Sequence, residues 1–272
     1  MEIIGSQIAL AFGLAILVAG FAYQLKYLSR SGFFAAAFLG AIIFGLGGLN
    51  WAILLILFFV SSSLLSKGFA SRKQKIAKQF SKGGRRDWAQ VFANGGVGAI
   101  LLLVSIGWQI DKSILWLGYA ASLAAVTADT WSTEWGVLST REPRLITSGR
   151  QVPPGTSGAI SMRGSLAGLA GALFIAISAW FLNTSEQGFL FVGLVLVSGF
   201  LGGLVDSIFG ATKQAIYYCP QHEKETEQNP LHYCGTTTTY LRGWRWMNND
   251  WVNFLSALAA TLIAVLGLAL VG

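Results

Sequence analysis

Eight apolar runs, each long enough to cross a membrane, constrain the fold of this chain more than any other feature. A helix needs about 20 mostly apolar residues to span ~30 Å of hydrocarbon. With 54% hydrophobic and 11% charged residues, the composition excludes a soluble domain, whose surface must be polar. We therefore expect an all-α, multi-pass integral membrane protein with about eight transmembrane helices. The predicted spans are 6–27, 32–48, 50–66, 89–108, 114–134, 163–181, 188–212 and 250–272.

The basic residues predict the orientation, because Lys and Arg flanking membrane spans stay on the cytoplasmic side. With both termini outside, the basic segments 67–86, 141–163 and 213–245 all lie inside. Of the 19 Lys and Arg residues, only Lys112 then faces outward. The net charge of +7 is therefore a property of the cytoplasmic face, suited to anionic headgroups or substrates. No nucleic-acid partner is expected, since topology alone explains the basic run.

The connections predict one membrane domain, 1–272, with a cytoplasmic Cys/His loop at 213–249. The outer connections are short and the inner ones long, and neither a fixed repeat nor a linker between domains is visible. The first residues run into the first span without a cleavage signal, so that span is expected to be retained. A plasma membrane and a thylakoid-type or other plastid membrane both stay open as locations, as does an oligomeric state.

Polar residues lie at the predicted cytoplasmic ends of the spans. A carboxylate inside a bilayer costs about 2.5–3.5 kcal/mol on insertion scales, so it usually has a function. Carboxylates with few partners are how proteins hold Mg²⁺ beside phosphates. We therefore expect a polar, cytoplasmic-side phosphoryl-transfer site with Mg²⁺ on Asp129 and Asp206. Its candidate residues are Asn94, Asp129, Glu134, Asp206, Lys213, Asn249, Asp250 and Asn253.

Two of these carboxylates, Asp129 and Glu134, need not share an ion. They are five residues apart and point about 140° apart on a regular helix. Three roles for Glu134 stay open. It binds the metal because the helix loosens before it, it binds an inner-loop arginine, or it is exposed to solvent at the end of the helix. For Asp129 and Asp206 the alternative is a buried structural pair. Glycines one turn on either side of Asp206 either make room for a ligand or serve close helix packing.

The loop LITSGRQVPPGTSGAISMRG is predicted to handle phosphate. Glycines and hydroxyl residues in it offer free backbone N–H groups and O–H groups, and two arginines flank them. The loop is not a Walker A sequence, and no dinucleotide fingerprint is present. The candidate residues are Arg150, Gly155, Thr156, Ser157, Gly158 and Arg163.

Every Cys and His of the chain lies in the loop YYCPQHEKETEQNPLHYCG. The pairs Cys219-x2-His222 and His232-x-Cys234 are plausible ligands for a tetrahedral Zn²⁺, which would be structural because all four positions are filled by protein. The alternative is a solvated loop with two reduced thiols, which a cytoplasmic location permits.

The motifs TADTWSTEWG, VPPGTSGAIS, GGLVDSIFGATKQ and RGWRWMNNDWVN, in this order between Asn94 and Asn253, resemble a membrane family. That family contains the phytyl-phosphate kinases of tocopherol synthesis and the transmembrane protein 19 group. In the last loop of the family a Cys pair is common, and His222 stands where the second Cys is expected. A more distant likeness links Asp129, the GTSGAIS to RGSLAG stretch and Asn249-Asp250 to CTP-dependent polyprenol kinases.

The resemblance implies a kinase that phosphorylates a membrane-embedded isoprenoid monophosphate, phytyl phosphate to phytyl diphosphate, with CTP or another nucleoside triphosphate and Mg²⁺. In this scheme Asn94 and Asn249-Asp250 orient phosphates or waters, and Lys213 with Arg163 neutralises charge. Two alternatives remain. An alcohol kinase for phytol or a polyprenol would use Glu134 as base, and a transporter or flippase of anionic lipids would place its polar groups near the midplane.

Overall fold

The computed structural model describes residues 2–69, 84–183 and 188–271. In these ranges a long helix forms at each predicted span, and the multi-pass membrane fold is confirmed. Six of the described helices are long and apolar enough to cross a membrane. The number of crossings and the side of each terminus remain predictions. Most of the predicted basic loop (70–83) and part of one outer connection (184–187) lie outside the described residues.

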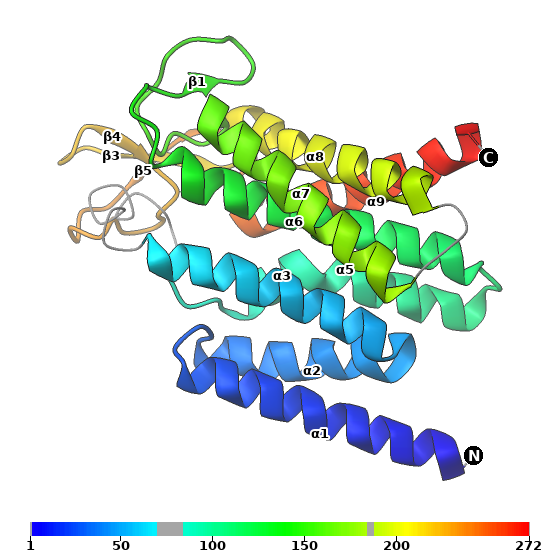
Figure 1. The fold of residues 1–272 in the computed structure, drawn as a ribbon. Helices are drawn as coiled ribbons and strands as arrows, with labels where there is room; N and C mark the ends of the chain where they lie inside the picture. Colours follow the sequence, from blue (N-terminus) through cyan, green and yellow to red (C-terminus); the bar gives the residue numbers. More distant parts are fainter. Residues whose placement is uncertain (1, 70–83, 184–187, 272) are drawn as a thin grey trace.

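The long helices run alongside one another, and the described strands lie beyond one end of them (Figure 1). They are α1 (Glu2–Gln24), α2 (Arg30–Gly47), α3 (Leu49–Gly68), α5 (Trp88–Gly107), α6 (Lys112–Gly136), α7 (Met162–Leu182), α8 (Gly188–Thr212) and α9 (Asn249–Val271).

Short strands add to the expected all-helical fold. An antiparallel pair is formed by β1 (Arg144–Leu145) and β2 (Ala159–Ile160). A second sheet has the antiparallel order β4-β3-β5 and contains β3 (Ile216–Cys219), β4 (Lys224–Thr226) and β5 (Thr239–Arg242). This sheet lies within the predicted Cys/His loop, which is therefore folded rather than irregular.

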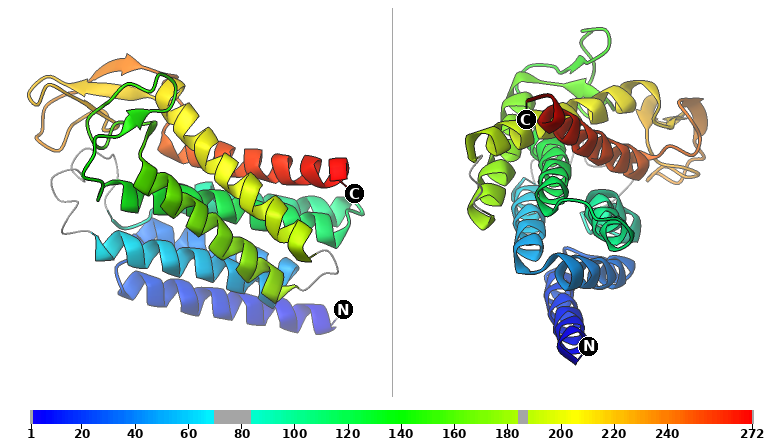
Figure 2. Two further views of the ribbon diagram at one scale, coloured as in Figure 1. Left: turned by 45° about the horizontal axis from the view of Figure 1, so that its top comes forward. Right: turned by 90° about the vertical axis from the view of Figure 1, so that its right-hand side faces the viewer.

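Helix α6 forms the centre of the bundle and packs against α3, α5, α7, α8 and α9 (Figure 2). Every residue from Leu115 to Ala128 is buried, as expected for a helix that is apolar on all sides. Small residues let neighbouring helices approach closely, which replaces the hydrophobic effect as the driving force in lipid. A Cβ at Gly202 of α8 would lie 2.6 Å from Ala125 Cβ and 2.8 Å from Ala260 Cβ. The outer faces carry exposed apolar side chains such as Leu17, Phe181 and Leu270.

The two ends of the bundle differ in character. The N-terminal end of α1 and the C-terminal end of α9 lie at one end, and all the described strands lie at the other (Figure 1). We call the end with the strands the polar end. The opposite end is filled by aromatic rings: Trp51 stacks on Tyr119 with centroids 4.2 Å apart, and Trp116 meets Trp51 edge-on. The Tyr119 hydroxyl donates to the Trp51 carbonyl at 2.9 Å.

Capping residues start the helices at the polar end. The Ser29 hydroxyl accepts from the Gly32 N–H, and Asp87 with Gln90 forms a capping box on α5. The segment before α5 is tied down by backbone hydrogen bonds from Ser29 N–H to the Arg86 carbonyl and from Arg86 N–H to the Tyr27 carbonyl. These bonds fix where Arg86 enters the bundle.

Candidate functional site

Three carboxylates from distant parts of the chain meet at the polar end. Asp129 lies on α6, Asp206 on α8, and Glu227 one residue beyond the end of β4. Each of these groups interacts electrostatically with the other two. Within the described ranges, no hydrogen bond reaches the Asp129 carboxylate. Like charges repel one another, so a bound cation would stabilise this cluster. The structure thus brings Asp129 and Asp206 together, as predicted, and adds Glu227.

One face of α9 extends this cluster. Asp250, Asn253 and Ser256 follow one another at a spacing of three residues, which keeps them on one side of the helix. The buried Ser256 hydroxyl lies 3.3 Å from Asp206 Oδ2 and donates to it. The side-chain oxygen of Asn253 is buried and has no hydrogen-bond partner among the described residues. A buried polar atom of this kind usually belongs to a site that receives a ligand or water.

Gln214 connects the cluster to two loops. It follows the end of α8 and is almost completely buried. Its amide nitrogen donates to Glu227 Oε1 at 2.8 Å, and its amide oxygen accepts from the Ser157 hydroxyl at 2.6 Å. The glycine-rich loop and the Cys/His loop are therefore held together at one side chain.

A pocket of about 490 Å³ opens beside the cluster and shares Glu227 with it. Its wall includes Gln214, Asn249 and Asp250, together with Arg245 and Trp246. This volume lies within the range of small-molecule sites, about 300–1,000 Å³. The pocket wall contains carboxylates, amides and one arginine. This lining suits a charged ligand that binds together with a cation.

Glu134 has different neighbours from Asp129. The Ser66 hydroxyl donates to Glu134 Oε1 at 2.7 Å, and Arg86 is attracted to the same carboxylate. Burial lowers the pKa of Arg86 to about 10, although the charge of Glu134 opposes this effect. Arg86 therefore stays protonated at neutral pH, over the rings of Phe58 and Phe59. Of the alternatives for Glu134, the solvated helix end is wrong, because this side chain is buried and accepts from Ser66, while its attraction to Arg86 is electrostatic.

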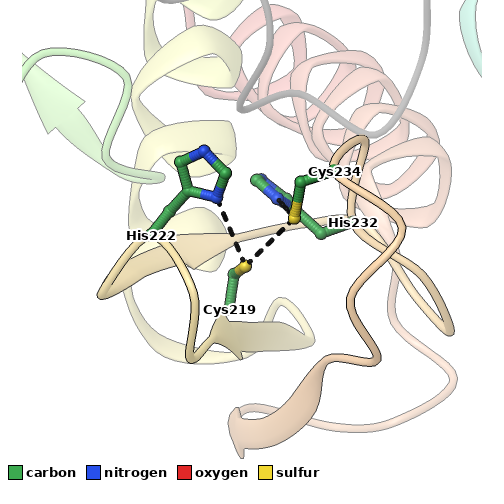
Figure 3. Close-up of side chains that lie close together, drawn as sticks. All are labelled: Cys219, His222, His232 and Cys234. Atoms are coloured by element: carbon green, nitrogen blue, oxygen red, sulfur yellow. Dashed lines mark hydrogen bonds between the residues drawn. The ribbon is translucent and has the colours of Figure 1, made fainter.

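The Cys and His residues converge on one point beside the sheet (Figure 3). The four potential ligand atoms all lie within 4.8 Å of one another. Cys219 and His232 are buried, and both cysteines are free thiols. Hydrogen bonding, first with the Thr236 side chain and then with His232, lowers the pKa of the Cys234 thiol to about 6. The cluster is separate from the three carboxylates, although Glu227 belongs to the same loop.

Comparison with known proteins places this arrangement in a family. The family described as integral membrane protein DUF92 matches residues 13–261. The chain belongs to the DUF92 family. This membership confirms the resemblance seen in the motifs.

Relatives of this DUF92 protein occur in plants and archaea. Protein PGR of Arabidopsis thaliana is 32% identical over 94% of this chain and 95% of its own length. Protein VTE6, chloroplastic, of the same plant is 28% identical over 95% of this chain and 70% of its own length. An uncharacterized membrane protein of Methanocaldococcus jannaschii is 35% identical over 68% of this chain and 74% of its own length. No solved structure matches the chain.

In this DUF92 protein the glycine-rich loop uses donors that were predicted to be free. The Thr156 N–H and hydroxyl both donate to the Pro153 carbonyl, at 3.2 and 2.8 Å, and the Ser157 hydroxyl donates to Gln214. The prediction of free donors is therefore wrong for these groups, because the turn and the contact with α8 consume them. Gly155 and Gly158 have φ values of 90° and 78°, and Gly158 packs against Ala211.

The remaining basic and amide candidates lie apart from the carboxylates. Arg163 donates to the Leu138 carbonyl at 2.9 Å, and Arg150 lies exposed on its loop. The Lys213 ammonium lies 4.9 Å from the centre of the Trp244 ring. Asn94 lines a small cavity of about 60 Å³ between α2, α3 and α5, which also receives Arg86. Nucleotide-binding roles for these residues stay predictions.

The site contains residues that sequence reasoning missed, namely Ser66, Arg86, Gln214 and Glu227. Glu227 lies among other charged residues in KETEQNP, so its bond with Gln214 and its interaction with the two aspartates leave no pattern in the sequence. Gln214 had a usable signal, since it is the last residue of the motif GGLVDSIFGATKQ, which also carries Asp206.

Proposed function

We propose that this DUF92 protein is a membrane kinase that phosphorylates an isoprenoid monophosphate, with phytyl monophosphate as the expected acceptor and CTP as the expected donor. The observation that carries the proposal is the position of Glu227, which joins the carboxylates of Asp129 and Asp206 and also lines the pocket. The cluster lies where the helices end, so a lipid phosphate at headgroup depth and a soluble nucleotide can both reach it.

The carboxylates suit Mg²⁺, because this ion takes one or two protein carboxylates and completes its shell with water and phosphate oxygens. When bound, Mg²⁺ would neutralise charge on the transferred group. In the reaction an oxygen of the acceptor phosphate bonds to the terminal phosphorus of the donor. The bond from that phosphorus to the bridging oxygen breaks, and an isoprenoid diphosphate and a nucleoside diphosphate form.

A phosphate acceptor fits the site better than an alcohol. A phosphate is already ionised and needs no strong base, whereas an alcohol requires one near its hydroxyl. Glu134 was the predicted base, but it accepts from Ser66 and lies beside Arg86. A transporter is less well supported, since transport sites usually lie near the membrane midplane, and here the carboxylates gather at one end.

The test uses purified protein in lipid vesicles with Mg²⁺ and a labelled CTP, ATP, GTP or UTP. Phytyl phosphate and phytol are offered separately, and lipid products are separated by chromatography. We expect phytyl diphosphate from phytyl phosphate, fastest with CTP. If phytyl diphosphate forms with none of the nucleotides, the proposal fails. Phytyl phosphate formed from phytol alone would support the alcohol kinase instead.

Asp129→Asn and Asp206→Asn separate a metal-ligand role from a structural one. As metal ligands, these carboxylates act on the transferred phosphate, so we expect normal folding and insertion with turnover lowered about 100-fold or more. A structural pair would instead lose about 3–5 kcal/mol of stability. Asp111→Asn is the matched control, because Asp111 caps the opposite end of α6 and Asn also caps well. Near-normal turnover of a stable Asp129→Asn protein would contradict the assignment.

A further inference from the structure

The Cys/His cluster has the dimensions of a tetrahedral metal site (Figure 3). Cys219 Sγ and Cys234 Sγ lie 3.8 Å apart, and His222 Nδ1 lies 3.7 Å from Cys219 Sγ. Bond lengths of ~2.3 Å to sulfur and ~2.05 Å to nitrogen place tetrahedral ligands about 3.8 Å apart for two sulfurs and about 3.6 Å for sulfur and nitrogen. His232 Nδ1, at 3.1 Å from Cys234 Sγ, needs only a small rotation to complete the set.

The surroundings orient these ligands for a metal. The Tyr233 hydroxyl lies 3.0 Å from His222 Nε2, which leaves Nδ1 of that ring to face the sulfur atoms. A metal-bound histidine commonly makes such a hydrogen bond through its other nitrogen. Gly235, directly after Cys234, has a φ of 84°, and its N–H donates to the His232 carbonyl at 2.8 Å. This tight turn presents His232 and Cys234 to the same point.

The ligands come from two chain segments that meet at this cluster. Cys219 ends β3 and His222 lies in the turn to β4, while His232 and Cys234 precede β5. Glu227 lies between the two ligand pairs, just beyond the end of β4. An ion at the cluster therefore closes a loop of which Glu227 is part, and fixes the position from which this carboxylate reaches Asp129 and Asp206.

We propose that Cys219, His222, His232 and Cys234 bind one structural Zn²⁺, which holds the segment carrying Glu227 against the membrane helices. Four protein ligands leave no open position, as in structural rather than catalytic zinc sites. Two thiolates and two neutral imidazoles also leave the complex without net charge, which suits a half-buried site. The binding of zinc does not rest on the proposed kinase activity.

The test is metal analysis of protein purified without chelators and without a polyhistidine tag. Because the chain has 2 Cys and 2 His residues in all, it has no second Cys/His site, and any zinc that the double variant retains would belong to carboxylates. We expect about one zinc per chain, and loss of it in a Cys219→Ser, Cys234→Ser double variant. Lys224→Gln, on β4 between the ligands, is the matched control and should keep the metal. Tyr233→Phe should keep zinc with an affinity about 10–100-fold weaker.

Two further measurements make the outcome decisive. Cobalt in place of zinc should give the visible absorption of a tetrahedral ion with thiolate ligands, and the double variant should lack it. Hydrogen exchange at 224–228 should become faster in the double variant while α6 and α8 stay protected. Wild-type protein without zinc, or with its two thiols joined in a disulfide, would overturn the proposal. So would unchanged exchange after zinc loss. Glu227→Gln, in contrast, should lose kinase activity and keep its zinc, which separates this proposal from the proposed function.

Discussion

Glu227 brings a third negative charge to Asp129 and Asp206, although it belongs to a loop and they belong to membrane helices. Gln214 holds it there by donating to Oε1 at 2.8 Å. A protein gains nothing in stability from gathering like charges, since each raises the cost of ionising the others. A ligand that supplies positive charge would offset this cost.

Glu227→Gln tests this explanation at the level of one residue. Glutamine keeps the shape and accepts the hydrogen bond from Gln214, but it lacks the charge that binds a cation. We expect turnover to fall about 100-fold at ordinary Mg²⁺, with partial recovery at high Mg²⁺. Rates measured across a Mg²⁺ titration give the result.

Glu225→Gln is its control, two residues earlier on the same hairpin. Glu225 is exposed and pairs with Arg242 at 3.3 Å. Surface pairs of this kind contribute about 0–1 kcal/mol, so activity should hardly change. Equal losses in the two variants would show that the hairpin responds to charge in general and not to a charge at Glu227.

Individual site residues were predictable where a charge interrupts an apolar run. Asp129 and Asp206 stand out for this reason, and the five-residue spacing indicated that Asp129 and Glu134 need not share one ion. Glu227 could not be found in the same way, because charges are ordinary in a loop. Its position depends on the β3–β4 register, which no periodicity of the sequence reveals.

At the level of elements, the spacing of the site is set by helices in close contact. Gly202 lies one turn before Asp206 on α8 and lets that helix meet α6 and α9. The distances within the cluster are thus set by backbone packing. The glycines serve close helix packing, which is one of the two interpretations of the sequence.

Gly202→Leu should force these helices apart. Its Cβ would lie 2.6 Å from Ala125 Cβ and 2.8 Å from Ala260 Cβ, with no flexible side chain to yield. Overpacking of this kind costs about 1–3 kcal/mol, so we expect a lower unfolding temperature in detergent and weaker activity. Gly193→Leu on the same helix is the control, because a Cβ there meets nothing within 4 Å. A wild-type melting curve for Gly202→Leu would refute the packing argument.

The elements themselves were largely predictable, since long apolar runs fix where membrane helices form. Observed ends differ from the predicted ones by a few residues, where capping residues such as Ser29 and Asp87 decide the start. The strands escaped prediction because they are two to four residues long. Tertiary pairing stabilises such strands, and their own sequence carries little signal.

The whole molecule is asymmetric along the direction of its helices. The carboxylates, the pocket and all the described strands lie at the polar end. The N-terminal end of α1 and the C-terminal end of α9 lie at the opposite end (Figure 1). Basic residues predict that the polar end faces the cytoplasm, where nucleotides are found.

Single cysteines can test this orientation. In the Cys219→Ser, Cys234→Ser background, Lys112→Cys and Arg141→Cys each place one exposed thiol at opposite ends. A membrane-impermeant maleimide added to intact cells should label Lys112→Cys and leave Arg141→Cys unlabelled until the membrane is opened. The reverse pattern would place the site outside the cytoplasm and would rule out a cytoplasmic nucleotide as donor.

The aromatic packing of Trp51, Trp116 and Tyr119 has a consequence for the electrical properties of the membrane. Core hydroxyls nearby are satisfied locally: Ser122 donates to the Tyr119 carbonyl and Thr261 to the Gly118 carbonyl. Because both hydroxyl protons are directed at backbone carbonyls, these two side chains are not aligned to pass a proton from the carboxylates toward the opposite face. We therefore expect the protein to keep its ionisable chemistry at one surface and to leave the membrane impermeable to protons.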